Sequence, residues 1–192
     1  MNYSKSEFMQ HTDSWKKLLN DYCFPTWDDL PSFDLYMDQV IALMNDYLSV
    51  FVPSGSTQAS AMTPPMINNY VKLKVMPAPR KKKYSKIHLA YLIMISSLKQ
   101  ALNIPSIQKI IPLLDNENDI RLMYEAFSEN QQKTFSYIAG KISSVAEPVF
   151  VSESGSAEKM HNLTVQIALS ANIFKVMTED IISSANADDK ND

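Results

Sequence analysis

The chain is poor in glycine and in cysteine, with only 3 glycines and 1 cysteine in 192 residues. A low glycine content disfavours a β-sandwich, a barrel or a glycine-dependent nucleotide loop, because these structures need many tight or left-handed turns. The single cysteine, Cys23, excludes an internal disulfide framework and fits a reducing compartment. These two shortages favour a helical protein of the cytoplasm.

Long apolar runs are also missing. The longest nearly charge-free apolar stretch, residues 87–98, is too short to cross a membrane as a helix. Residues 1–20 carry several charges where a secretory signal would have an apolar core. With 45% hydrophobic residues, the chain can bury one good core, with room for a small appended lobe. We therefore expect no membrane association and a cytoplasmic location.

No sequence motif indicates catalysis or metal binding. The chain has no glycine-rich phosphate loop, G-x-S-x-G, H-E-x-x-H or C-x-x-C. His11, His88 and His161 are scattered, without a carboxylate or cysteine at a spacing typical of metal ligands. We expect no enzymatic activity, no cofactor and no metal.

Acidic residues are absent between Asp46 and Asp115, and the cations of this interval give it a net charge of +9. The flanking residues 1–46 and 115–192 carry net charges of -5 and -7. A basic middle between acidic ends produces a local positive field suited to a polyanion.

Apolar spacing predicts two helices in the first segment, residues 1–53. One covers residues 4–22, and a strongly amphipathic one covers 33–51, with Ser32 and Asp34 as possible caps. A loop with two prolines separates them.

The second segment, residues 54–114, begins with a flexible connector and then a helix at 63–74, where Thr63 precedes Pro64. Alternating prolines predict an extended path over residues 76–79, which the basic residues 80–83 continue as an extended arm. An apolar helix over 86–102, capped by Ser85, is expected to be the buried centre, and a short helix follows from Asn103.

The third segment, residues 115–192, is predicted to contain helices at 116–130, 131–147 and 157–184. The last one carries an apolar stripe: Met160, Leu163, Ile167, Ala171, Phe174, Met177 and Ile181. This stripe can pack within the chain, or it can form the interface of a homodimer.

MINNYVKLKVM resembles the recognition-helix segment of MerR-type regulators, and PAPRKKKYSKIHLAYLIMISSLKQALNIPSIQKIIPLL is similar to the wing and following helices of that family. Ile67, Tyr70 and Tyr84 match its buried isoleucine, second tyrosine and wing tyrosine. The chain as a whole, including LPSFDLYMDQV, also looks like a bacterial family of domains of unknown function with a MerR-like core. The resemblance implies a mostly α-helical protein with a winged helix-turn-helix core at 54–114 and additional N- and C-terminal helices.

The same resemblance implies a transcriptional regulator that binds duplex DNA. Asn68, Asn69 and Lys74 depart from the family pattern, which has arginine, tyrosine and glycine there. Asparagine can still bond bidentately to adenine, and lysines can reach phosphates. Free amides at the Thr63 end of the helix would add a dipole that attracts a phosphate. The expected DNA-binding residues are Thr63, Asn68, Asn69, Tyr70, Lys72, Lys74, Arg80, Lys81, Lys82, Lys83, Tyr84 and Lys86.

Other interpretations of the basic stretch remain open. Residues 80–83 can be a solvated loop or a localisation signal, and Asn68 and Asn69 can be ordinary exposed helix residues. Tyr70 and Tyr84 fit packing at least as well as ligand contact. The same basic surface can also bind an acidic protein partner, which would make the chain a non-enzymatic interaction module. An effector ligand, if any, is not identified by any motif.

Overall fold

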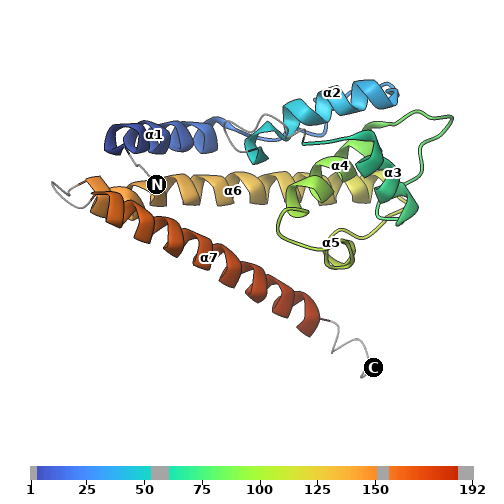
Figure 1. The fold of residues 1–192 in the computed structure, drawn as a ribbon. Coiled ribbons are helices and arrows are strands. Elements are labelled where there is room, and N and C mark those ends of the chain that lie inside the picture. The colour runs from blue at the N-terminus through green and yellow to red at the C-terminus, as the bar shows by residue number, and fades with distance from the viewer. Residues whose placement is uncertain (1–3, 53–60, 151–155, 186–192) are drawn as a thin grey trace. The chain divides into compact units, whose positions relative to one another are not determined.

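The computed structural model describes residues 4–52, 61–150 and 156–185. Within these ranges the chain forms helices without β-strands, and the only β-type pairings are two isolated bridges. The helices are α1 (Lys5–Asp21), α2 (Met37–Tyr47), the 3₁₀ helix η1 (Ser49–Phe51), α3 (Pro64–Lys72), α4 (Lys86–Leu98), α5 (Ile104–Ile110), α6 (Glu117–Phe150) and α7 (Ser156–Ser184) (Figure 1). The prediction of a mostly α-helical protein is confirmed.

The helices divide between two compact units. One unit combines Met1–Cys23 with Asn130–Ile181, and the other combines Phe24–Glu129 with Ile182–Asp192. Each unit joins stretches that are far apart in the sequence, whereas the three segments expected from the sequence are each continuous.

The unit that contains Phe24–Glu129 is built around α4. Every residue of α4 from His88 to Ser96 is buried. This explains why the sequence of α4 is apolar on all sides, since a helix surrounded by others has no solvent face. Figure 1 shows α2, α3 and α5 gathered around α4, close to the start of α6.

The loop after Cys23 is fastened to the start of α6. The Tyr124 hydroxyl donates a hydrogen bond to the Pro25 carbonyl at 2.7 Å, and the Tyr124 ring lies 6.1 Å from the Trp27 ring. Arg121 pairs with Asp28 at 3.2 Å at the exposed edge of this contact. The buried hydroxyl is thereby satisfied, and the aromatic surface of the loop joins the core.

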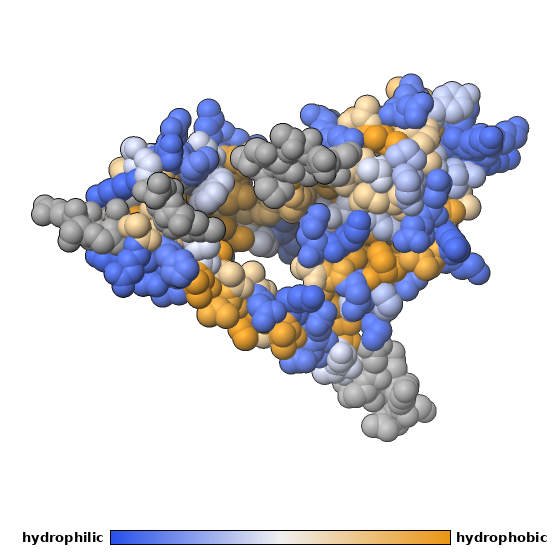
Figure 2. All heavy atoms as spheres, in the orientation of Figure 1, coloured by the Kyte–Doolittle hydropathy of each residue, from blue (hydrophilic) through white to orange (hydrophobic). Residues whose placement is uncertain are grey.

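The other unit has a smaller core. Phe8 of α1 packs against Val149 at the end of α6 and against Met160 and Leu163 near the start of α7. Beyond Leu163, most large apolar residues of α7 are exposed; they are Val165, Ile167, Leu169, Ile173, Phe174, Val176, Met177 and Ile181. Figure 2 shows hydrophobic side chains gathered along this helix.

Several predicted helices differ from the observed ones, and the predicted helix 86–102 ends already at Leu98. The predicted helix 33–51 begins only at Met37, because Leu35 is extended and forms an antiparallel bridge with Tyr84. Its cap is therefore Tyr36, whose N–H donates to the Gln39 side chain, and not Ser32 or Asp34.

The predicted helices 116–130 and 131–147 are one continuous helix, α6. The residues at the supposed junction, SENQQK, include no proline or glycine, so nothing in them stops a helix. The break expected after residue 147 falls partly on residues 151–155, which lie outside the described residues.

No helix in the described part of the chain is long and apolar enough to cross a membrane. In that same part, no group of three or more His, Cys, Asp or Glu side chains is arranged to hold a metal ion.

Candidate nucleic-acid interface

Helix α3 has two faces with different chemistry. Ile67 and Tyr70 are buried against the core. Asn68, Asn69 and Lys72 are exposed on the helix. Residues one and four positions apart fall within one broad sector of a helix, so these three side chains form one polar face.

The start of α3 does not offer free amides, which corrects one expectation. Thr63 is the N-cap, but its side chain makes no capping hydrogen bond. Pro64 and Pro65 have no N–H, and the N–H groups of Met66 and Ile67 both donate to the Thr63 carbonyl, at 3.1 and 3.3 Å. Because these amides are absent or used, any anion at this helix would have to be held by side chains.

Side chains of two other helices hold α3 at both ends. Asn45 of α2 accepts a hydrogen bond from the Met62 N–H at 2.9 Å and donates to the Met62 carbonyl at 3.4 Å. Gln108 of α5 donates to the Leu73 carbonyl at 3.1 Å. The polar face of α3 is therefore presented by a helix that is fixed on both sides.

The C-terminus of α3 ends in a Schellman motif with lysine in the usual place of glycine. The Val75 N–H donates to the Tyr70 carbonyl, and the Lys74 N–H donates to the Val71 carbonyl, each at 3.1 Å. Lys74 has a φ of 55°, which is the left-handed conformation that this motif requires. The exposed Lys74 side chain thus lies two residues after the exposed Lys72.

The basic stretch 80–83 is a tight turn and not the extended arm that the sequence predicted. The Lys83 N–H donates to the Arg80 carbonyl at 3.0 Å, and these two residues form an antiparallel bridge. Between them, Lys81 and Lys82 have φ values of 52° and 63°. Two consecutive left-handed residues are typical of a type I′ hairpin turn. The two prolines before the turn favour an extended backbone over residues 77–79. The bridge between Arg80 and Lys83 then reverses the direction of the chain.

Both sides of this turn are fastened to the core. Leu35 and Tyr84 exchange two backbone hydrogen bonds, each at 2.8 Å. On the other side, His88 Nε2 lies 3.3 Å from the Ala78 carbonyl, and His88 Nδ1 lies 3.0 Å from the Ser85 N–H. Since Nδ1 accepts from that N–H, Nε2 carries the proton and donates to Ala78. One neutral histidine thus joins the start of α4 to the entrance of the turn.

The environment of His88 favours its neutral form. Burial lowers the pKa of His88, and its hydrogen bond to Ala78 opposes this effect in part, as does the charge of Asp34. The Tyr84 ring stands edge-on to the imidazole at 5.5 Å. Protonation would place a charge among mostly buried groups beside the turn.

The cations of the basic stretch differ in what holds them. The Lys83 ammonium lies 5.2 Å from the centre of the Tyr36 ring, and that of Lys86 lies 5.6 Å from the Trp27 ring. By contrast, Lys72, Lys74, Arg80, Lys81 and Lys82 are exposed. Within the described ranges, none of these seven cations forms an ion pair within 4.0 Å. Hydrogen bonds with Thr26 and, to a lesser degree, the charge of Lys86 nevertheless lower the pKa of the Asp29 carboxyl. The cations that have neither a ring nor an ion pair in the described part of the chain are therefore the exposed ones of α3, its C-terminus and the 80–83 turn.

The predicted site residues thus divide by position. Asn68, Asn69, Lys72, Lys74, Arg80, Lys81 and Lys82 are exposed, and Thr63, Lys83 and Lys86 are half-buried. Tyr70 and Tyr84 are buried, with 1% and 3% of their surface exposed, and burial raises the pKa of both hydroxyls. They belong to the packing beneath the surface.

Sequence analysis missed the residues that position this surface. Asn45 and Gln108 act on backbone groups far along the chain, and Trp27 and Tyr36 supply the rings beneath two lysines. No local pattern identifies such pairs, because each depends on the folded arrangement of several helices.

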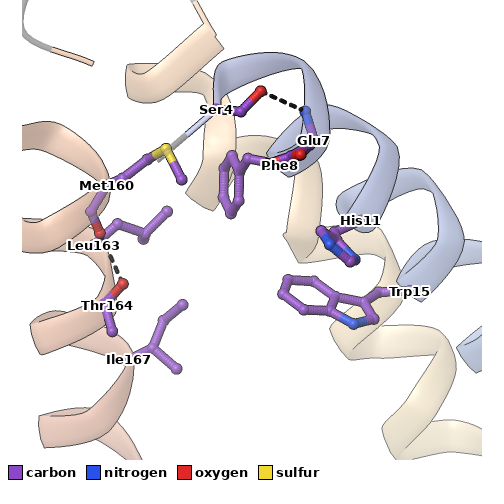
Figure 3. Close-up of a pocket in the computed structure, with 9 residues that line it drawn as sticks. All are labelled: Ser4, Glu7, Phe8, His11, Trp15, Met160, Leu163, Thr164 and Ile167. Atoms are coloured by element: carbon purple, nitrogen blue, oxygen red, sulfur yellow. Dashed lines mark hydrogen bonds between the residues drawn. The ribbon is translucent and has the colours of Figure 1, made fainter. Parts of the chain in front are cut away.

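A concave feature lies in the unit that contains α1 and α7, well away in sequence from the basic stretch. It is an open, mainly apolar hollow of about 450 Å³, lined by Ser4, Glu7, Phe8, His11, Trp15, Met160, Leu163, Thr164 and Ile167. Figure 3 shows Phe8, His11 and Trp15 of α1 facing Leu163 and Ile167 of α7. The Thr164 hydroxyl donates to the Met160 carbonyl, so it does not point a free polar group at the hollow.

Comparison with known proteins identifies a family and no characterised relative. No curated protein and no solved structure matches the chain. One family model, the Domain of unknown function (DUF1836), matches residues 25–127. These residues nearly coincide with the continuous part of the unit built on α4, Phe24–Glu129, which contains the whole basic surface. Since the match spans more than half of the 192 residues, the chain belongs to the DUF1836 family.

Proposed function

We propose that this protein is a DNA-binding transcriptional regulator of MerR-like type, without enzymatic activity and acting in the cytoplasm. In this proposal α2 and α3 form the helix-turn-helix, the predicted helix 63–74 reads the DNA, and the stretch 77–85, which contains the 80–83 turn, is the basic wing. The observation that carries it is a pair of exposed asparagines on α3, close in sequence to a basic turn that forms no ion pair with any carboxylate in the described part of the chain.

The exposed face of α3 suits the reading of bases. An α-helix fits the major groove of B-DNA, and an asparagine there can pair bidentately with adenine N6 and N7. Asn68 and Asn69 are exposed on a helix whose opposite face is buried, and Lys72 lies within reach of flanking phosphates. The fixation of α3 by Asn45 and Gln108 would limit the loss of conformational freedom on binding.

The 80–83 turn suits contact with the sugar–phosphate backbone. Arg80, Lys81 and Lys82 are exposed, and their turn is fastened on both sides by Leu35 and His88. Backbone contacts of this kind fix the register of a protein on duplex DNA and carry no sequence information themselves. In this proposal the residues of α3 recognise the bases, and the residues of the 80–83 turn position the protein on the DNA backbone.

The proposed regulator is a homodimer through α7. A single helix-turn-helix gains affinity and specificity when two copies contact two half-sites. Ile167, Phe174 and Met177 of the predicted stripe share one side of α7 and are exposed, and an exposed apolar surface of this kind marks an interaction site on a protein. We propose that a second copy of the chain covers it.

Selection of bound fragments from a random duplex pool tests the proposed function. We expect enrichment of a motif that contains adenine at the contacted positions, and binding at physiological salt that heterologous DNA displaces only in excess. Absence of any enriched motif, together with binding of polyglutamate as tight as that of DNA, would replace the regulator with a module for an acidic protein partner.

A further inference from the structure

Three lysines of the basic surface occupy backbone positions that lysine does not favour. Among the described residues, the non-glycine residues with positive φ are Lys74, Lys81 and Lys82. A side chain with a Cβ is strained in this region, and glycine or asparagine relieves that strain. All three residues in this strained conformation are lysines, and all three lie between α3 and α4.

Nothing in the fold explains the choice of lysine at these positions. Lys74, Lys81 and Lys82 are exposed, and no ring or carboxylate of the described residues holds their ammonium groups. Lys83 and Lys86 behave differently, because each lies over an aromatic ring. Solubility does not require the strained positions either, since a lysine at any exposed, unstrained position would serve it equally well.

The two backbone motifs indicate which residues would make the folded protein more stable at these positions. A Schellman motif most often has glycine at the position of Lys74. A type I′ turn most often has Asn-Gly at the positions of Lys81 and Lys82. A strained residue that neither the backbone nor internal contacts favour is typical of a site kept for a ligand.

We propose that Lys74, Lys81 and Lys82 form the phosphate-contacting set of the interface, and that the fold gives up stability to keep lysine at these three left-handed positions. This inference rests on the proposed DNA binding and deepens it. The ligand is the phosphate backbone of duplex DNA, contacted without regard to base sequence, because an ammonium group on a flexible stem is a point charge without directional preference.

A pair of variants with equal charge separates the strain from the contact. Lys81→Asn with Lys82→Gly removes two charges and relieves the strain, whereas Lys81→Ala with Lys82→Ala removes the same charges and keeps it. We expect the Asn-Gly variant to melt about 2–4 °C higher than wild type for each kcal/mol of strain relieved, and the Ala-Ala variant to show no such rise.

Binding of a short random-sequence duplex is then measured over a range of salt concentrations. Each lost phosphate contact should lower the slope of log K against log salt by about 0.9, so both variants should lose about 1.8 from the slope. Lys81→Arg with Lys82→Arg keeps the charges and should retain the wild-type slope. Lys74→Gly should behave as a single-site version of the Asn-Gly variant, with a loss of about 0.9.

The outcomes distinguish the two proposals. If the Asn-Gly variant and Lys74→Gly both bind the duplex with the wild-type slope, the three lysines are not phosphate contacts, and the proposed function can still stand on α3. If the variant binds less but melts no higher than the Ala-Ala variant, no stability is given up at the turn and the inference fails in that part. If wild type itself binds no duplex, the proposed function fails, and the phosphate site fails with it.

Discussion

At the scale of single residues, His88 is the titratable group with the most structural consequence. It is buried in its neutral form and connects the start of α4 to the Ala78 carbonyl at the entrance of the basic turn. Its pKa is lowered in the folded protein by burial, while the unfolded chain keeps the ordinary value of 6.5. The unfolded state therefore binds a proton first as the pH falls.

This difference predicts a loss of stability at mildly acidic pH. The free energy of unfolding should be unaffected by His88 well above pH 6.5, and should fall as the pH drops from about 6.5 towards the lower folded pKa. The midpoint of urea unfolding measured between pH 5 and 7, at a constant m-value, reports this change. His88→Gln should flatten the dependence, and the exposed His161→Gln should not; equal pH dependence in wild type and His88→Gln would assign the effect to other groups.

Asn68 and Asn69 carry the residue-scale prediction for base reading. Replacing the contacting asparagine with alanine should weaken binding to a selected site about 5- to 150-fold, because a bidentate contact with adenine is worth about 1–3 kcal/mol of discrimination. Binding to random duplex and the salt slope should stay unchanged. Fluorescence anisotropy with both duplexes measures this, and Asn172→Ala on exposed α7 is the matched control. If both α3 variants bind the selected site like wild type, α3 is a packing element only.

At the scale of helices, the link between α2 and α3 depends on Asn45. Its side chain satisfies both backbone groups of Met62, on the far side of a connector that includes residues 53–60. Asn45→Ala would leave a partly buried N–H without this acceptor, and we expect a loss of about 1–3 kcal/mol in the free energy of unfolding. Chemical denaturation measures it, with Asn172→Ala again as control. A loss no larger than that of the control would show that the hydrogen bonds contribute nothing net.

The sequence was sufficient where an element is fixed by neighbouring residues. Thr63 before two prolines, Ser85 before an apolar run, and Asn103 before Ile104 and Pro105 each predicted a helix start that the structure confirms. These caps act over three or four residues, so a linear pattern contains all the information.

The elements that the sequence did not reveal depend on distant partners or lack a local signal. The bridge between Leu35 and Tyr84, which delays the start of α2, joins residues far apart along the chain. The turn at 80–83 has four basic residues and none of the glycine or asparagine that normally marks a type I′ turn. At the candidate site, the identity of the exposed cations was predictable, but their division between ring-held and exposed lysines was not, since the rings come from other parts of the fold.

At the scale of the whole molecule, the two units differ in how well they bury their apolar residues. The unit built on α4 encloses a large core, whereas α7 leaves most of its apolar side chains exposed beyond Leu163. Exposed apolar area of this extent lowers solubility unless another surface covers it. Ile167, Phe174 and Met177 of the stripe predicted from the sequence are thus not buried by packing within the described chain. We therefore propose that the stripe packs against a second copy in a homodimer.

A charge on this surface tests the dimer without disturbing the core. Phe174 has 67% of its surface exposed, so Phe174→Asp should leave the helical content and melting of the monomer intact. It should nevertheless convert dimers to monomers in sedimentation at micromolar concentration, because an interface core does not accept an unpaired carboxylate. Asn172→Asp adds the same charge on the side of α7 that carries Leu169 and Val176, away from the stripe that contains Phe174, and should stay dimeric because the stripe is the proposed interface. On duplex DNA, Phe174→Asp should bind a palindromic selected site far more weakly than wild type but an isolated half-site equally well, because only the link between two half-sites is lost. A monomeric wild type, or a Phe174→Asp variant that sediments as a dimer, would remove α7 as the interface.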